Sequence, residues 1–279
     1  MTRRVSIITA AYAPLSTYFK ATIESVRAQE LPEGWELEWL VQEDGEHPDL
    51  EGVVAGVPGI KYAANNAHTG ISATRNLALT RATGDIVQVL DHDDVLLPGA
   101  LKTLLPRFDD PSIHWVVGQA DDLLPDGTRR EYESALPFGR VAAGAVNTWA
   151  IEHGGNWPIH CAGLLMRTQL VRACGGWGGV PVDDDIVMFS ALSEIADGYN
   201  DPATTWLYRI HEQQTHKSAQ WRERSADGRR IAMQRVQALR ATGLAITGDP
   251  ANAQRPHEVE VGPAAKEGAD GRPWWKDQN

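Results

Sequence analysis

The sequence predicts an α/β fold with a mostly parallel sheet, and three observations lead to this prediction. Short apolar runs of strand length recur at residues 5–11, 37–41, 60–64 and 86–90. The segments after the first and third runs place apolar residues three or four positions apart, which is typical of helices. Polar residues follow the strand-like runs directly, where right-handed crossovers gather the loops at the carboxyl edge of a sheet.

Composition and charge limit the class of protein. The chain has 279 residues, 42% of them apolar, which is enough for the core of one large domain. Its formal net charge is −11, from 26 basic and 37 acidic residues. A nucleic-acid polymer or an anionic membrane would need a basic face, so both are disfavoured as partners.

Cysteine usage and hydropathy favour a cytoplasmic protein. The two cysteines, Cys161 and Cys174, show no spacing typical of a zinc site. The N-terminal apolar run is too short for a signal peptide or a membrane span. No other window reaches the roughly 18 uncharged apolar residues that a spanning helix needs. We therefore expect a soluble chain without an integral membrane segment.

The first crossover is predicted within residues 5–45. After the first strand, Ser16 is expected to cap a helix with apolar residues at i, i+4 and i+7. The second strand, at 37–41, ends in the acidic sequence EDG at 43–45. The polar residues after both strands should therefore lie at the same edge of the sheet.

The second crossover runs from the strand at 60–64 to a helix that Gly84 is expected to end. Arg75 lies in the first turns of this helix. From there it could point at a phosphate near the helix N-terminus, or it could form a surface salt bridge. The segment alone leaves both alternatives open.

The fourth strand, residues 86–90, ends in the sequence Asp91-His92-Asp93-Asp94. Adjacent carboxylates repel one another unless they share a positive charge. Oxygen ligands on a loop suit Mg²⁺ or Mn²⁺, which can take their other ligands from a substrate diphosphate. For this stretch alone, a solvated acidic turn followed by a helix cap is the alternative.

The sequence contains neither G-x-G-x-x-G after the first strand nor G-x-x-x-x-G-K-[ST] anywhere. Dinucleotide-dependent dehydrogenases and P-loop enzymes need such glycine-rich backbone to hold phosphate, so both classes are disfavoured. Metal and arginine are the means that this chain offers for holding a phosphate.

In order and spacing, these motifs resemble the nucleotide-binding half of family 2 glycosyltransferases of the GT-A fold. The stretches concerned are VSIITAAY at 5–12, EDG at 43–45, GISATRNLAL at 70–79 and GDIVQVLDHDD at 84–94. The resemblance covers roughly residues 5 to 110, and less specific motifs extend it to about residue 215. It implies a Rossmann-like, mixed and mostly parallel sheet flanked by helices, in a single domain with a C-terminal helix and a tail.

The resemblance also implies a nucleotide-sugar donor, which carries uracil in many relatives. Asp44 would accept a hydrogen bond from the base, and Arg75 would face the diphosphate or the base. Asp91 would lie near the ribose or the donor sugar, while the side chain of His92 is expected to point into the fold. The candidate donor-binding residues are Thr9, Ala11, Tyr12, Asp44, Arg75, Asp91 and His92.

A divalent cation, Mn²⁺ or Mg²⁺, is the cofactor that the resemblance implies. Asp93 would be its direct ligand. The Tyr-Arg-x-His segment at 208–211 resembles one that closes over the donor in relatives, and His211 is the position that could complete the metal shell.

A second acidic cluster, Asp183-Asp184-Asp185, follows a Gly- and Trp-rich stretch and precedes a helical pattern. Helix capping and the helix dipole could explain it. The order is also similar to the segment that supplies the general base in inverting members of the family. In that register Asp185 is the base and Asp184 is the second candidate.

The segment at residues 135–160 is predicted to be irregular, and it is rich in Gly, Asn and Trp. Loops of this kind carry recognition, and tryptophan offers a platform for a sugar. Trp149 and Trp157 could instead cover the core, and His160 could be buried. The candidate acceptor-binding residues are Trp149, Trp157, His160 and Trp177.

Together these features predict a metal-dependent, inverting glycosyltransferase of the hexosyltransferase type. It would move a sugar from a nucleoside diphosphate sugar to a hydroxyl or amine, for instance on a small metabolite. The alternatives are a non-catalytic nucleotide-sugar-binding scaffold and a sugar-nucleotide pyrophosphorylase. A homodimer is left open.

The predicted organisation of the chain has four parts. They are a donor-binding half at 1–110, an acceptor-binding and catalytic-base half at 111–220, a C-terminal helix at 221–247, and a tail or lid at 248–279 that contains Trp274 and Trp275.

Overall fold

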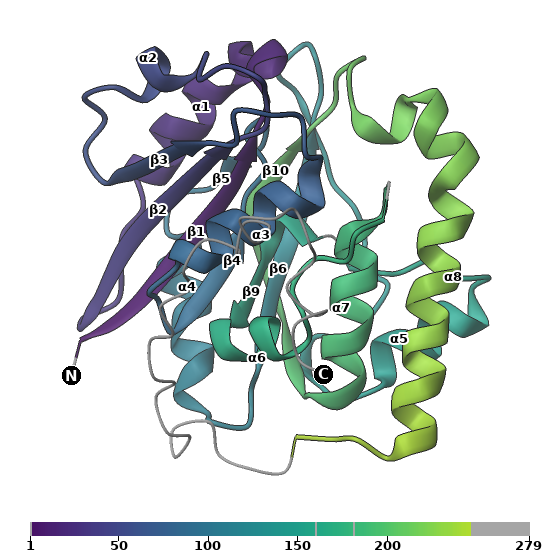
Figure 1. Ribbon diagram of the computed structural model, residues 1–279. Helices are drawn as coiled ribbons and strands as arrows, with labels where there is room; N and C mark the ends of the chain where they lie inside the picture. Colours follow the sequence, from purple (N-terminus) through teal and green to yellow (C-terminus); the bar gives the residue numbers. More distant parts are fainter. Residues whose placement is uncertain (1, 160, 181, 247–279) are drawn as a thin grey trace, which may run out of the picture. The chain divides into compact units, whose positions relative to one another are not determined.

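The computed structural model describes residues 2–159, 161–180 and 182–246. The strands of this part form one ten-stranded sheet, with helices on both faces (Figure 1). Eight strands follow the order β3-β2-β1-β4-β9-β6-β10-β5, while β7 pairs with β6 and β8 pairs with β10. The longest ladders are parallel and the short ones antiparallel. The predicted mixed, mostly parallel sheet is confirmed.

The first half of the sheet is entirely parallel. β1 pairs with β2 along its whole length, from Arg3↔Trp35 to Ala11↔Glu43, and β4 lies on its other side. Because these strands run in one direction, their carboxyl ends meet at one edge. The strands are β1 (Arg3–Ala11), β2 (Trp35–Glu43), β3 (Ile60–Ala64) and β4 (Ile86–Val89).

The helices of this half agree with the predicted crossovers, with two corrections. The first helix begins at Ser16 itself, and Leu15 takes the cap position without a side-chain hydrogen bond. The second ends at Arg81 instead of Gly84, because Ala82 already has extended backbone. The elements are η1 (Ala13–Leu15), α1 (Ser16–Arg27), α2 (Glu51–Val54), α3 (Ile71–Arg81), α4 (Ala100–Leu104) and η2 (Leu105–Asp109).

The second half of the sheet is mixed. β9 runs antiparallel to both β4 and β6, and so joins the two parallel parts of the sheet. β10 is parallel to β6 and antiparallel to β5. The strands are β5 (Val95–Leu96), β6 (Trp115–Leu123), β7 (Arg129–Arg130), β8 (Gly139–Val141), β9 (Leu164–Arg167) and β10 (Gly198–Arg209).

The prediction of an irregular segment at 135–160 is wrong for residues 145–152, which form a helix. Val146 and Ala150, one turn apart, are fully buried there, so tertiary packing outweighs the loop-like composition. The remaining elements are α5 (Ala145–Glu152), η3 (Cys161–Gly163), α6 (Thr168–Ala173), α7 (Asp184–Ile195), η4 (Thr215–Lys217) and α8 (Ala219–Thr242).

Two apolar cores lie on the two faces of the sheet. Ile7 of β1 and Ile86 of β4 belong to the core that α1 and α4 cover. Their neighbours Ile8 and Val87 belong to the core that α3, α6 and α7 cover. Both faces are therefore buried, which explains why these strands are continuous apolar runs in the sequence.

Some predictions lie outside this description. His160 and the tail at 248–279, with Trp274 and Trp275, fall outside the described residues. The functional division of the chain near residue 110 stays a prediction. Within the described ranges, no helix has the length and apolar character required to cross a membrane.

Gly198, at the start of β10, provides a test of the packing. A Cβ at this position would lie 1.9 Å from ring carbon Cε2 of Trp115. The Trp115 ring is held in place, since its Nε1 donates to the Ala196 carbonyl at 3.1 Å and the ring packs perpendicular to that of Phe189. We expect Gly198→Ala to lower the free energy of unfolding by about 1–3 kcal/mol, as measured by urea denaturation.

The matched control is Gly52→Ala in α2, where nothing lies within 4 Å of the added Cβ. This variant should be close to neutral. Equal stabilities for the two variants would contradict the packing described for β10.

Candidate active site

The loop at residues 91–94 connects β4 to β5 at the carboxyl edge of the sheet. Thr22 Oγ1 in α1 lies 2.9 Å from the His92 carbonyl and 2.8 Å from that of Asp94. At the end of β10, Arg209 donates from Nε to the Asp93 carbonyl at 2.7 Å and from its backbone N–H to Asp94 Oδ1 at 2.9 Å. Two elements that are distant in sequence thus hold this loop.

The two side chains predicted to bind metal lie next to each other. His211 Nε2 is 2.9 Å from Asp93 Oδ2, although 118 residues separate them in the sequence. His211 Nδ1 accepts the backbone N–H of Gln213 at 3.2 Å. In the neutral imidazole Nε2 therefore carries the proton, and this N–H donates a hydrogen bond to Asp93.

A divalent cation could take Asp93 and His211 as protein ligands. Among the residues that the structure describes, no three or more His, Cys, Asp or Glu side chains are grouped as a metal site. Mg²⁺ and related cations often keep several waters and bind through one or two protein groups plus substrate phosphates. One carboxylate and one imidazole fit that pattern when the ring proton of His211 lies on Nδ1, in the tautomer that gives up the hydrogen bond from Gln213.

Arg75 of α3 joins the acidic loop to α7. Its Nη2 donates to Asp91 Oδ1 at 2.7 Å, and its Nη1 donates to Asp184 Oδ2 at 3.0 Å. Only 4% of its side chain is exposed, so the alternative of a surface salt bridge is wrong. Burial lowers the pKa of Arg75, but Asp184 and Asp91 outweigh burial and the net shift is upward. A contact with phosphate stays a prediction.

The two candidate bases have different surroundings. Asp184 is buried against Arg75, and burial raises the pKa of its carboxyl to about 6 although Arg75 opposes the shift. Asp185 is half-buried in the first turn of α7, where its Oδ1 accepts the N–H of Ile186 at 2.8 Å. Its Oδ2 forms no hydrogen bond within the described part of the chain. Asp185 is therefore the more available carboxylate.

Asp183, the third acid of this cluster, holds the loop against α8. It has a left-handed backbone, with φ of +59°, and its Oδ1 accepts Trp221 Nε1 at 2.8 Å. Gly228 of α8 lets this helix pack closely against the loop, because a Cβ at position 228 would lie 2.7 Å from the Val182 carbonyl oxygen. Its contacts give Asp183 a structural role.

Three predicted donor-binding side chains lie in the core. Thr9 is fully buried, and its Oγ1 accepts Trp39 Nε1 at 2.9 Å. Ala11 on the same strand is buried as well. His92 points into the fold, as expected, and packs edge-on against Phe19 at 6.3 Å between ring centroids. All three side chains face the interior, and a donor contact at these positions stays a prediction.

Two other donor candidates lie at the edge of the sheet. Tyr12 is 41% exposed and meets the ring of His68 edge-on at 6.0 Å. Asp44 Oδ1 accepts the backbone N–H of Thr69 at 2.7 Å, so this carboxylate orders the loop before α3. Their donor contacts stay predictions. Glu43 is fully buried.

The tryptophans proposed for the acceptor differ in exposure. Trp177 is only 2% exposed and belongs to the core, and its assignment to an acceptor site stays a prediction. Trp149 stacks on His153 at 3.7 Å, and Trp157 Nε1 donates to Asn147 Oδ1 at 2.9 Å. Both are half-buried and pack against the core, as the alternative interpretation proposed. An acceptor contact of either stays a prediction.

Sequence reasoning missed the residues that hold the loops in place. Thr22 and Trp221 carry no local signal, since their partners lie 70 and 38 residues away. Arg209 stands within the Tyr-Arg-x-His segment, and that motif is the one signal that could have pointed to it.

The sheet order and the acidic end of the central strand β4 define a GT-A-like α/β domain. Crystal structures of S. aureus TarS 1–349 in complex with UDP and with UDP-GlcNAc both align with a TM-score of 0.60. The sequence identities are 14% and 17%. The first alignment covers 85% of this chain and 65% of the TarS chain, and the second covers 78% and 61%. This likeness confirms the fold.

Residues 6–163, more than half of the chain, match the model of Glycosyl transferase family 2, and the chain belongs to this family. The predicted resemblance to this family is confirmed.

Curated relatives match part of the chain, and two of them have descriptive names. GalNAc(5)-diNAcBac-PP-undecaprenol beta-1,3-glucosyltransferase of Campylobacter jejuni subsp. jejuni serotype O:2 is 34% identical over 97 residues, which are 33% of this chain and 30% of that protein. The succinoglycan biosynthesis protein ExoO of Rhizobium meliloti is 30% identical over 139 residues, which are 49% of this chain and 39% of that protein. The match spans less than half the length of each relative.

Asp184 should make stability depend on pH. Its pKa of about 6 in the folded chain exceeds the ordinary value of 3.8, so the folded chain binds this proton more tightly than the unfolded chain. The stabilisation is present below about pH 4 and is lost as the pH rises through about 6. We expect Asp184→Asn to flatten the fall in unfolding free energy between these pH values, as measured by urea denaturation.

Asp49→Asn is the matched control, because Asp49 is exposed on the loop before α2. Its pH profile should follow that of the wild type. A wild-type slope in Asp184→Asn would contradict the environment described for Asp184.

Proposed function

We propose that this chain is a glycosyltransferase, metal-dependent and inverting, which uses a nucleoside diphosphate sugar with UDP as the favoured nucleotide. The acceptor group would be a hydroxyl or an amine. The observation that carries the proposal is the Arg75 bridge, which links Asp91 at the end of β4 to Asp184 beside the candidate base. The predicted donor end and the predicted base thereby lie on two sides of one buried guanidinium.

The acidic loop would hold the donor diphosphate through a cation. Asp93 and His211 are the residues that would bind Mn²⁺ or Mg²⁺, and Arg209 and Thr22 keep their loop in position. When bound, the cation would neutralise negative charge on the departing nucleoside diphosphate. The UDP complex of the structurally similar TarS supports uracil as the base.

Asp185 would act as the general base. Its carboxylate takes the proton from the acceptor hydroxyl while the acceptor oxygen attacks the anomeric carbon. The bond to the diphosphate breaks on the opposite side, so the anomeric configuration inverts. Asp184 stays with Arg75 and positions the first turn of α7, which leaves Asp185 available for the proton.

The nature of the acceptor, the homodimer and the cytoplasmic location stay predictions. The names of the curated relatives support a saccharide acceptor, since one acts on an undecaprenol-linked saccharide and the other belongs to succinoglycan biosynthesis.

Nucleotide binding should depend on the predicted metal ligand. We expect UDP with Mn²⁺ to raise the melting temperature of the wild type by several degrees, because the ligand binds only the folded chain. Asp93→Asn should remove the part of the shift that depends on Mn²⁺. A thermal-shift series with UDP, GDP, TDP and CDP, each with and without Mn²⁺, measures both effects.

Glu152→Gln, an exposed change on α5, is the control and should behave as the wild type does. The donor proposal is wrong if none of the four nucleotides shifts the melting temperature. Nucleotide binding without any turnover of UDP-glucose or UDP-GlcNAc would favour the scaffold alternative. Formation of UDP-sugar from UTP and a sugar 1-phosphate would favour the pyrophosphorylase.

The base assignment predicts a split between binding and turnover. Asp185→Asn should lower kcat by about 10²–10⁴-fold, because a positioned general base contributes that much. Its UDP-dependent thermal shift should equal that of the wild type. UDP release from UDP-glucose or UDP-GlcNAc in the presence of methyl glycosides measures the turnover.

Asp184→Asn is the comparison for this experiment. If Asp184→Asn suppresses turnover and Asp185→Asn does not, the base is Asp184 and the predicted register is shifted by one residue.

A further inference from the structure

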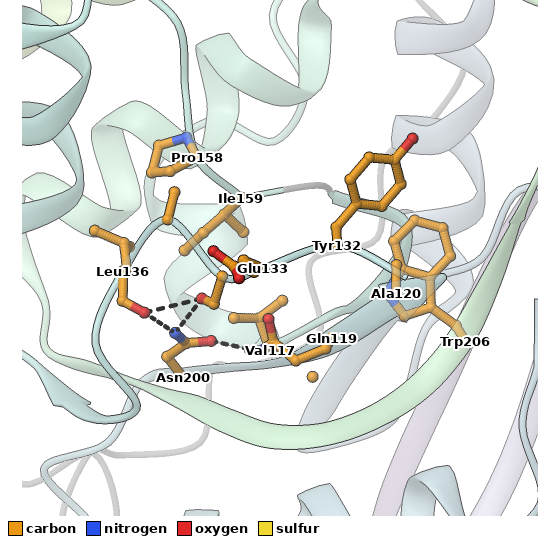
Figure 2. A pocket seen from close by; sticks show the side chains of 13 residues that line it. Val117, Gln119, Ala120, Tyr132, Glu133, Leu136, Pro158, Ile159, Asn200 and Trp206 are labelled. Carbon is orange, nitrogen blue, oxygen red and sulfur yellow. Dashed lines mark hydrogen bonds between the residues drawn. The ribbon is translucent and has the colours of Figure 1, made fainter. Parts of the chain in front are cut away.

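One cavity in the described part of the chain is lined by none of the candidate site residues assigned above. It has a volume of about 180 Å³ and lies between β6, β10 and the loop at 132–136. Figure 2 shows Tyr132, Ile159, Glu133 and Trp206 around this space. The volume suits a single small ring and excludes a long chain.

The floor of the cavity is a network of amide hydrogen bonds. Asn200 is 3% exposed, and its Oδ1 accepts Gln119 Nε2 at 2.8 Å. Its Nδ2 lies 3.1 Å from Ser134 Oγ and 3.0 Å from the Leu136 carbonyl, toward both of which it donates. These bonds, drawn in Figure 2, attach the loop at 132–136 to β10. The cavity is therefore formed before any ligand arrives.

Glu133 supplies a carboxylate to this cavity. Glu133 is one of the lining residues, and Figure 2 draws it between Ile159 and Gln119. The side chain is exposed and forms no hydrogen bond or ion pair with the residues that the structure describes. A carboxylate can accept hydrogen bonds from two hydroxyl groups of one ligand.

Two aromatic side chains, Tyr132 and Trp206, line another part of the cavity wall. The Tyr132 ring is held by its hydroxyl, which donates to Asp122, and by the guanidinium of Arg130 at 5.4 Å from the ring centroid. Trp206 is almost fully buried and contributes a second apolar surface. A carboxylate opposite aromatic rings suits a pyranose, which has hydroxyl groups at its rim and C–H groups on its faces.

The cavity is close to the predicted reaction centre. Trp206 precedes Arg209 by three residues of β10, or about 10 Å along a strand. Arg209 in turn holds the backbone of Asp93. Trp206 also pairs with Leu96 of β5, the strand that begins directly after Asp94. The wall of the cavity and the acidic loop are thus connected through β10 and β5.

We propose that this cavity is the acceptor subsite and that it binds one uncharged pyranose ring of a glycoside acceptor. The inference rests on the proposed transferase function and adds the class of acceptor to it. Glu133 accepts hydrogen bonds from ring hydroxyls, and Tyr132 packs against a face of the ring. The carboxylate also repels anionic sugars, so a uronic acid is excluded at this position.

The test uses methyl β-D-glucopyranoside and methyl β-D-glucuronide with the full chain, and saturation-transfer NMR measures their dissociation constants. The wild type should bind the neutral glycoside more tightly than the anionic one. Glu133→Gln should weaken binding of the neutral glycoside about tenfold, the loss expected for one charge-assisted hydrogen bond, and should reduce the discrimination between the two. Tyr132→Ala should weaken binding, whereas Tyr132→Phe should retain the packing of the ring.

Glu131→Gln is the matched control, since Glu131 is exposed two residues earlier and does not line the cavity. It should bind both glycosides as the wild type does. Equal binding of the two glycosides by the wild type, or unchanged binding in Glu133→Gln, overturns the subsite. The UDP-dependent thermal shift separates the two proposals. If only the subsite proposal is wrong, UDP still raises the melting temperature of each variant. If the donor proposal is wrong, UDP raises the melting temperature of none of them.

Discussion

The buried guanidinium of Arg75 is the interaction on which the rest of the site depends. A single charge at this depth would be strongly destabilising without partners, and two carboxylates from different elements compensate for it. Asp91 comes from the end of β4 and Asp184 from the start of α7. Arg75 is therefore satisfied only when both elements have reached their places against α3. One side chain thus keeps the predicted donor end and the predicted base in a defined geometry.

The acidic loop contains a second constraint, which explains how three neighbouring carboxyl groups are tolerated. Asp94 is fully buried, and its Oδ2 has no hydrogen-bond partner in the described structure. Burial raises the pKa of Asp94 well above its ordinary value, and Asp93 and Asp91 raise it further. The raised pKa favours the protonated form of Asp94, which adds no like charge to the loop. Asp91 is paired with Arg75 and Asp93 with His211, which leaves each carboxyl group in a different role.

The acceptor side is built in another way. The acidic loop is held by buried ion pairs and by bonds from α1 and β10, whereas the cavity beside β6 rests on the amides of Asn200 and Gln119. Tyr132 and Glu133 stand on an exposed loop above this floor. Exposed loop residues can change without disturbing the sheet, and in this way one fold can serve different acceptors. The inferred specificity for an uncharged ring therefore belongs to this chain rather than to its fold.

The sequence by itself determined the parallel half of the sheet and the acidic candidates at its edge, because strand periodicity and the order of the motifs are local properties. Its resemblance to the family also selected Asp93 and His211, which the structure brings to 2.9 Å. Only the tertiary structure decided that Thr9 and Trp177 are core residues and that Arg75 joins Asp91 to Asp184. Arg75 and Asp184 are 109 positions apart. Contacts over such separations depend on how helices pack on the sheet, and no local pattern shows which side chain a buried charge will meet.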